Sequence, residues 1–466
     1  MFRNFRRIWL VPIVIVLGVV IYFLPPVHDR LAGRLDDLRA QVRFYFNPPD
    51  QAVFKPAQSQ QDAIKAIVNA TMQAYNLAQT SSLTPYPLKP GPIKTGSTPV
   101  SPTPSPTLVP EQLPQNVSLP GVIYMDQHGG WNLCGPTNLT MDLKFWGWKG
   151  SREDVINVIK PGVNDPKLDL ISRGKPDKNV MPYEMVDFVQ DNTEYHALYR
   201  YGGDMDLLRK LLASGYPVLI EKGVYEKDAS GVFSWLGHYA FVTGYDDGQG
   251  IFIYQDTYPP EGVNGNNRQI SYADFKTGWR AFNYLFIVVY PAASEPDVFK
   301  VIGSWGDIGW ANRHALDIAN QETHTLTGLD LYFAWFNKGT SDVQLTQYNA
   351  AGLDYDQAFN LYPNLPIAAK DRPYRMLWYQ TGPYWAYYYT TRYQDVINLA
   401  NTTLGTVLGG PTLEESIYWR GMAEAALGDM NSAISDFKRA NHLNPKMAVV
   451  IQELQTLGLA PETPIQ

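Results

Sequence analysis

The stretch of sequence that decides the fold is DQHGGWNLCGPTNLTMDLKFWGW, residues 126–148. Its apolar residues, among them Leu139 and Leu143, recur at helical spacing, and Pro136 suits a first helical turn. The pattern therefore predicts a helix that begins near Cys134. A thiol there lies at the positive end of the helix dipole, which favours the thiolate that attacks carbonyl carbon.

Cys134 is the only cysteine among the 466 residues. An internal disulfide and a cysteine-rich zinc site are therefore both excluded, and the side chain is a free thiol. We expect no metal and no cofactor. Two interpretations of Cys134 stay open at this point, a nucleophile and a small buried apolar residue, which is what most lone cysteines are.

A thiol nucleophile needs a base, and His238 is the best placed of the seven histidines. It opens HYAFVTGYDDGQGIFIYQDTY, in which two strand-like runs flank a turn rich in Asp and Gly. A hairpin symmetric about Asp247 places His238 directly opposite Asp256, on one face of the sheet. A carboxylate there fixes the imidazole tautomer and leaves the other nitrogen for the thiol. A slip of one residue separates the two side chains, and Asp256 is then a solvated carboxylate at a strand end.

These residues together resemble a known family. Gln127, the Cys-Gly-Pro of residues 134–136, the Gly-His-Tyr of residues 237–239 and the later Asp256 resemble the papain-like cysteine peptidases typified by the leader-peptide-cleaving domain of bacteriocin exporters. The chain is more similar to the free-standing extracytoplasmic relatives of that domain. The resemblance covers about residues 119–293 and implies an α+β papain-like domain, with an N-terminal helix on an antiparallel sheet.

The resemblance also implies roles for single residues. Cys134 is the expected nucleophile, His238 the base, Asp256 the orienting carboxylate and Gln127 a side-chain donor of the oxyanion hole, with the backbone N–H of Cys134 as second donor. The sequence departs from the exporter pattern in two places. Gln127 lies seven residues before the cysteine instead of six, and Asn132-Leu133 replaces an acidic residue. No ATP-binding loop accompanies the domain, so we do not expect an exporter.

The N-terminus predicts an uncleaved membrane anchor. Arg3, Arg6 and Arg7 precede the uncharged apolar run of residues 8–24, and no clean signal-peptidase site follows. The arginines favour a cytoplasmic tip and an extracytoplasmic bulk, that is, a single-pass protein of the cell membrane. A Pro, Ser and Thr-rich segment further on predicts a linker without a core.

The last third of the chain predicts tetratricopeptide repeats. Small residues, aromatic residues and a closing proline recur at the spacing of that repeat. The three expected copies are residues 332–365, 377–410 and 414–447, of which the middle one is degenerate. Three copies suffice to share a core. Each copy should be a pair of helices, and together they form an all-α solenoid.

The whole sequence thus predicts a multidomain chain. The expected parts are a cytoplasmic tip with anchor at 1–27, juxtamembrane helices at 28–79, a linker at 80–118, the papain-like domain at 119–293, a connecting helix at 294–330 and the repeats at 331–460. A net charge of -7 lacks the basic excess that nucleic acid requires, so no nucleic-acid partner is expected.

Two functions fit this organisation. The first is a cysteine peptidase or amidase that acts on a peptide or protein substrate, with repeats that recruit a protein partner. The second is a non-catalytic binding or scaffold protein that keeps a papain-like shell. The intact set of Cys134, His238 and Asp256 favours the first.

Overall fold

The computed structural model describes residues 113–128, 132–160, 179–227, 232–406 and 413–462, together with Val42, Phe54 and Pro56. The predicted anchor and almost all of the predicted juxtamembrane and linker segments lie outside these residues. Within the described ranges, no helix combines the length and the apolar character needed to cross a bilayer.

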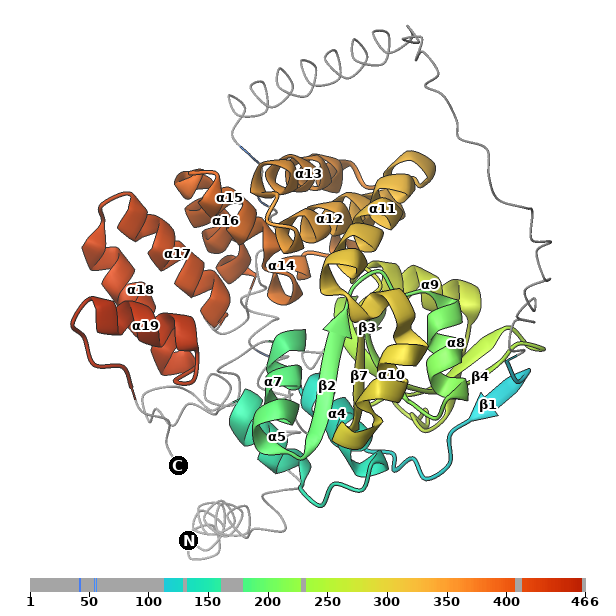
Figure 1. Ribbon diagram of the computed structural model, residues 1–466. Helices are drawn as coiled ribbons and strands as arrows, with labels where there is room; N and C mark the ends of the chain where they lie inside the picture. The colour runs from blue at the N-terminus through green and yellow to red at the C-terminus, as the bar shows by residue number, and fades with distance from the viewer. Residues whose placement is uncertain are drawn as a thin grey trace, which may run out of the picture. The chain divides into compact units, whose positions relative to one another are not determined.

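The first part of the fold is a seven-stranded antiparallel sheet with helices on both faces (Figure 1). Six strands follow the order β2-β7-β3-β4-β5-β6, and β1 pairs with β4. The strands are β1 (Asn116–Ser118), β2 (Tyr195–Arg200), β3 (Val218–Lys227), β4 (Phe233–Asp246), β5 (Ile251–Gln255), β6 (Arg268–Ser271) and β7 (Phe286–Pro291). The helices are α4 (Cys134–Phe145), α5 (Arg152–Ile159), α7 (Pro182–Asn192), α8 (Met205–Ala213), α9 (Tyr272–Arg280) and α10 (Glu295–Ile302). This α+β arrangement fits the predicted papain-like domain.

The two faces of the sheet carry separate cores because side chains alternate along each strand. On one face, Leu219 and Phe241 pack with residues of α4 and α7. On the other face, Ile220 and Val242 pack with residues of α8, α9 and α10. Strands buried on both faces explain why their sequences are nearly continuous apolar runs.

The β4–β5 hairpin exists, but the predicted register is wrong. Asp246 pairs with Ile251 across a loop of residues 247–250, so the hairpin is not centred on Asp247. The register then shifts at a bulge between Val242 and Gly244, and Val242 pairs with Tyr254. A turn register continued without the bulge would put His238 and Asp256 on opposite faces. The extra residue at the bulge reverses the alternation and returns both side chains to one face.

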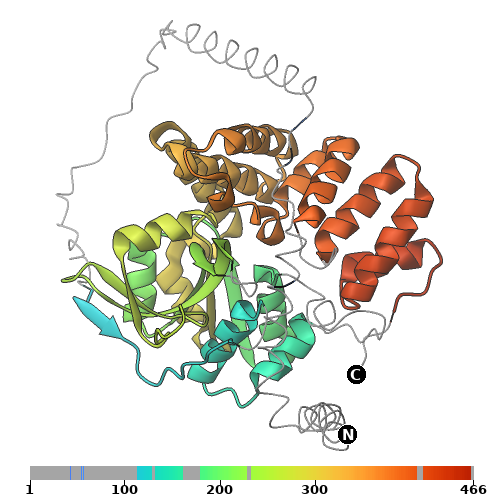
Figure 2. The ribbon, with the colours of Figure 1, turned by 180° about the vertical axis from the view of Figure 1, so that it is seen from behind.

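The second part of the fold is helical. The predicted connecting segment 294–330 contains the short α10, the longer α11 (Ile308–Thr325) and the start of α12, instead of a single helix. Helices that follow are α12 (Gly328–Gln344), α13 (Tyr348–Leu361), the short α14 (Met376–Tyr379), α15 (Gly382–Tyr389), α16 (Tyr393–Gly405), α17 (Glu414–Ala426), α18 (Met430–Leu443) and α19 (Ala448–Thr456). The pairs α12–α13, α15–α16 and α17–α18 lie side by side in both views (Figures 1 and 2). They correspond to the three predicted repeats, except that α12 begins at Gly328, before the first predicted copy, and membership of the tetratricopeptide class stays a prediction.

Two of these pairs repeat the same close contact. A β-carbon added to Gly339 of α12 would lie 2.9 Å from the Tyr355 ring of α13. One added to Gly421 of α17 would lie 2.9 Å from the Phe437 ring of α18. The sequence separation between the glycine and the ring is the same in both pairs. A large ring on one helix fits only because the facing residue of the other helix is a glycine.

The sheet and the helices share one core. Trp235 of β4 stacks on Phe282 at a centroid distance of 6.0 Å and also contacts Phe333 of α12. Phe54, from the predicted juxtamembrane segment, is buried against Phe359 of α13, with ring centroids 5.5 Å apart. The helical part therefore completes the hydrophobic core of the sheet and does not stand apart from it.

Candidate active site

Cys134 is the first residue of α4, where the sequence predicts the helix to begin. The N–H groups of a first helical turn have no partners within the helix, so their positive ends face the thiol. Asn138 of the next turn donates to the carbonyl oxygen of Cys134 at 2.8 Å and to that of Tyr239 at 3.0 Å. This amide therefore ties the start of α4 to the strand that carries His238.

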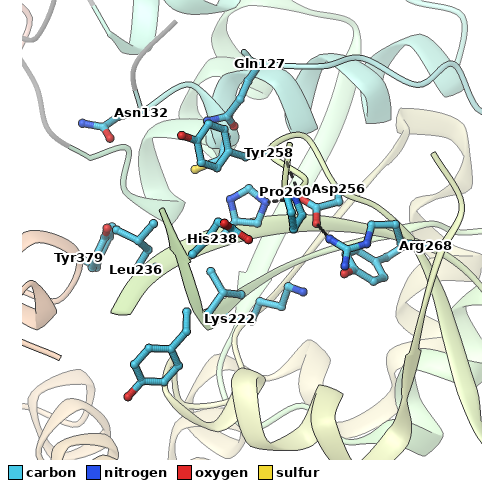
Figure 3. A pocket seen from close by; sticks show the side chains of 16 residues that line it. Gln127, Asn132, Lys222, Leu236, His238, Asp256, Tyr258, Pro260, Arg268 and Tyr379 are labelled. Carbon is cyan, nitrogen blue, oxygen red and sulfur yellow. Dashed lines mark hydrogen bonds and ion pairs between the residues drawn. The ribbon is translucent and has the colours of Figure 1, made fainter. Parts of the chain in front are cut away.

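His238 lies in the middle of β4, is buried, and faces both other groups. Its Nε2 is 3.0 Å from Oδ1 of Asp256 (Figure 3). The ring also acts on the Cys134 thiol, as a hydrogen-bond partner and as a positive charge. Asp256 directly follows β5. The structure thus brings together the three side chains that the sequence singled out, through the bulged register described above.

The electrostatics of this group favour a thiolate beside an imidazolium. Burial raises the pKa of the Cys134 thiol, but the hydrogen bond and the charge of His238 outweigh it, and the pKa is lowered overall. Burial lowers the pKa of His238, but its hydrogen bonds to Asp256 and Cys134 raise it by more, and the resulting pKa is about 9. Between the two pKa values the thiol is deprotonated and the imidazole protonated.

Asp256 is held by more than His238. The guanidinium of Arg268, on β6, donates to its Oδ2, and the backbone N–H of Tyr258 donates to Oδ1 at 3.0 Å. Burial raises the pKa of Asp256, but His238, Lys222 and Arg268 hold it well below the ordinary value. The carboxylate is therefore charged and fixed in orientation.

Gln127 is buried and lines the same cavity as Cys134. Its backbone N–H donates to the Thr257 carbonyl at 2.9 Å, and its Oε1 accepts from the Thr257 hydroxyl at 2.8 Å. With the oxygen engaged in this way, the amide nitrogen of Gln127 is the end left to face a substrate oxygen. Residues 129–131, between Gln127 and α4, lie outside the described part of the chain.

The cavity in front of these side chains has a volume of about 230 Å³. One of its walls comes from outside the sheet, because Tyr379 of α14 lines it. The Tyr379 ring packs on Gly237, the residue before His238, where a β-carbon would lie 2.9 Å from the ring. Helices of the C-terminal part therefore shape the cleft at the candidate nucleophile.

Sequence reasoning missed four residues around this site, namely Glu221, Lys222, Arg268 and Tyr379. Lys222 pairs directly with His238 across β3 and β4, and Arg268 pairs with Tyr254 across β5 and β6. The alternation of each strand predicts a face but not a partner strand, so only the order of strands places these cations. No grouping of metal-binding side chains was found among the described residues.

The site thus gathers a thiol, an imidazole and a carboxylate around one cavity. Residues 119–287 match the model of the Peptidase_C39 like family, which supports a cysteine-peptidase function in general terms. This match does not reach helices α10 to α19. No curated protein matched the sequence.

Three solved structures are similar to part of the chain. A protein of Bacillus anthracis described as a C39-like peptidase shares 17% identity at a TM-score of 0.28, over 37% of this chain and 96% of that one. The peptidase domain of Streptococcus ComA, a bifunctional ABC transporter, shares 19% identity at a TM-score of 0.25, over 34% of this chain and 92% of that one. Xylellain, a cysteine protease from Xylella fastidiosa, shares 18% identity at a TM-score of 0.25, over 39% of this chain and 87% of that one.

Proposed function

We propose that this protein is a membrane-anchored, extracytoplasmic cysteine peptidase or amidase that cleaves a peptide bond through Cys134, His238 and Asp256. The observation that carries the proposal is the position of His238, whose Nε2 lies 3.0 Å from Asp256 and whose ring lowers the pKa of the Cys134 thiol. Such an imidazole accepts the thiol proton and later delivers it.

The proposed reaction has two stages. The Cys134 thiolate attacks the carbonyl carbon, and the backbone N–H of Cys134 and the amide of Gln127 stabilise the negative oxygen that forms. His238 then gives its proton to the leaving amine, and a thioester remains. In the second stage water attacks the thioester and His238 takes a proton of that water. The C–S bond then breaks, which releases the acid and restores the Cys134 thiolate beside the imidazolium.

Asp256 has a supporting role in this proposal. It accepts a bond from Nε2, which keeps that nitrogen protonated and turns the other nitrogen toward the thiol. The bonds from Arg268 and Tyr258 keep the carboxylate from rotating away from the ring.

The membrane anchor and the recruiting role of the repeats belong to the same proposal. The arginines and the apolar run at the N-terminus support an anchored chain with its bulk outside. The paired helices α12 to α18 support a surface for a protein partner. Removal of residues 1–27 is expected to release the protein from membranes into the soluble fraction.

The test of the catalytic proposal is hydrolysis of a broad peptide library by the full-length protein. Cleavage should vanish in Cys134→Ala and fall by about 10³-fold in His238→Ala, by analogy with other triads. His196→Ala, which changes an exposed histidine, serves as the control and should keep full activity. Gln127→Ala should cost about 10²-fold, as loss of an oxyanion-hole donor does.

A different outcome would favour the scaffold function. If no peptide is cleaved by wild type, while a protein partner binds wild type and Cys134→Ala equally, the papain-like part has a binding role. Equal hydrolysis by wild type and Cys134→Ala would assign the activity to another site or a contaminant.

A further inference from the structure

A second cavity, of about 340 Å³, lies between the sheet and the helical part, next to the candidate cleft. Its walls come from the start of α7, the strands β2 and β3, and the helices α12, α13 and α15. Tyr379 lines both this cavity and the cleft that holds Cys134. The proposed catalytic chemistry does not use any residue of the second cavity.

A buried acid lies in the wall of this cavity. Glu221 of β3 is 2% exposed, and its Oε1 has no hydrogen-bond partner among the described residues. Its neighbour Lys222 points to the opposite face of the sheet, because side chains alternate along a strand. Glu221 is also the only charged residue among those described in the wall, so no cation of the cavity pairs with it.

One oxygen of this buried carboxyl, Oε1, lacks a partner, and a ligand group that donates to it would remove the cost of burying it. Burial raises the pKa of Glu221 well above its ordinary value, and the nearby Cys134 charge adds to this. A hydrogen bond with the Tyr239 hydroxyl opposes the shift. The raised pKa favours the neutral acid, and a cation bound beside Glu221 would favour its charged form.

Much of the remaining wall is aromatic. Five tyrosines and one tryptophan surround the cavity, namely Tyr183, Tyr199, Tyr201, Tyr348, Tyr379 and Trp385. The face of an aromatic ring attracts a cation, and the attraction grows when both are shielded from water. Aromatic rings around one carboxyl suit the ammonium or guanidinium group of a long side chain, whose methylene stem also packs on rings.

The cavity is close enough to Cys134 to bind a residue near the bond that is cut. The Cys134 charge acts on Glu221, and Tyr379 separates the two cavities. Glu221 also pairs directly with Tyr239, which follows His238 on β4. A peptide whose carbonyl lies at the thiol thus needs only a short extension to place a side chain in the second cavity.

We propose that the cavity around Glu221 is a specificity site that binds a lysine or arginine side chain of the substrate, beside the bond that is cut. This inference rests on the proposed peptidase function for its context, but the cation site itself does not require turnover.

The experiment uses full-length protein and peptides that carry one lysine at successive positions before the scissile bond. Matched peptides carry norleucine, which has a similar length and no charge. At one position we expect kcat/KM for the lysine peptide to exceed that for the norleucine peptide by about tenfold or more. The reason is that a desolvated cation there contacts aromatic rings as well as a carboxyl. Glu221→Gln should remove most of that preference. Trp385→Ala, at an exposed ring, should reduce it without disturbing the core.

The control is Glu194→Gln, which removes an exposed negative charge outside the cavity and should leave the lysine preference intact. Binding of the same peptides to Cys134→Ala, followed by tryptophan fluorescence, gives a readout without hydrolysis. If binding depends on lysine and Glu221 while wild type cleaves nothing, the site stands and the peptidase function fails. If peptides are cleaved or bound with no lysine preference at any position, or with one that Glu221→Gln leaves unchanged, the cation site is wrong.

Discussion

At the scale of single residues, the reactivity of Cys134 depends on His238. Alkylation of Cys134 by iodoacetamide should rise with pH to a midpoint below the ordinary thiol value of about 8.5, because His238 lowers the thiol pKa. His238→Ala removes both the hydrogen bond and the charge, so its midpoint should move upward. Cys134→Ala gives the unlabelled blank, since the chain has no other cysteine. An identical midpoint in wild type and His238→Ala would contradict the pairing.

The same pair predicts the upper limit of the activity profile. The pKa of His238 is raised to about 9, so the imidazolium that protonates the leaving amine persists below that pH and is lost above it. Hydrolysis should therefore decline as the pH passes about 9. Asp256→Asn removes the group that supports the raised pKa, so the decline should begin at lower pH, with about 10²-fold or more lower activity. A pH profile of kcat/KM for both proteins measures this shift.

Gly237 is a position where a side chain cannot fit. A β-carbon there would lie 2.7 Å from Phe282 and 2.9 Å from Tyr379, so Gly237→Ala should push Tyr379 out of the cleft wall. We expect about 1–3 kcal/mol of lost stability, as for other overpacked sites, and a lower kcat/KM. Gly352→Ala is the matched control, since its nearest neighbour would be 3.6 Å away. Unchanged activity in Gly237→Ala would mean that Tyr379 does not shape the cleft.

At the scale of elements, two helix pairs carry the same partly buried charge pattern. In α12–α13, Lys338 lies 2.8 Å from Asp354, and Asp342 hydrogen-bonds Asp354. In α17–α18, Arg420 pairs with Asp436 at 2.6 Å, and Glu424 lies at the position equivalent to Asp342. Each pair thus sets two carboxyls against one cation.

This pattern predicts how the helices respond to alkaline pH. Burial and then Asp342 raise the pKa of Asp354 to about 8, above the value of an unfolded chain. The stabilisation is therefore full at low pH and is lost as the pH rises toward about 8. In Asp342→Asn the side-chain amide donates to Asp354 without a shared proton. The melting temperature of this variant should therefore fall less between pH 7 and 9 than that of wild type. We expect the variant to be about 1 kcal/mol more stable than wild type at pH 9. An equal alkaline loss in both proteins, measured by calorimetry, would exclude a shared proton.

At the scale of the whole molecule, the shared core predicts that the sheet and helices unfold together. Arg375, before α14, is buried and bonds the hydroxyl of Ser234 and the carbonyl of Trp235 at 3.3 Å. Urea should expose Cys134 to labelling and abolish the helical circular dichroism signal at one midpoint. Arg375→Met should lower the urea midpoint of both signals equally, because it leaves buried acceptors unpaired. The free energy of unfolding should fall by about 1–3 kcal/mol.

The control for this experiment is Arg313→Met, at an exposed arginine of α11, which should change neither midpoint. Two well-separated transitions in wild type would show that the helices are an independent domain. In that case the contacts of Trp235 with Phe333 contribute little to stability.

The sequence by itself determined the elements whose signals are local. The spacing around Cys134 predicts the start of α4, and repeated small and aromatic residues predict the helix pairs α12–α13, α15–α16 and α17–α18. The pairing of His238 with Asp256 was also predicted, but from a register that the structure does not adopt. Turn geometry and a bulge depend on backbone conformation, which a pattern of apolar residues does not specify.

Only the tertiary structure decided what surrounds the site. Arg268 reaches Asp256 because β6 pairs with β5, and Tyr379 reaches Gly237 because α14 packs on β4, more than a hundred residues away in sequence. Glu221 becomes a buried acid in a cavity only when the helical part covers that face of the sheet. The physical reason is the same in each instance. Local spacing fixes which face a side chain takes, whereas burial and charge pairing depend on which distant segment covers that face.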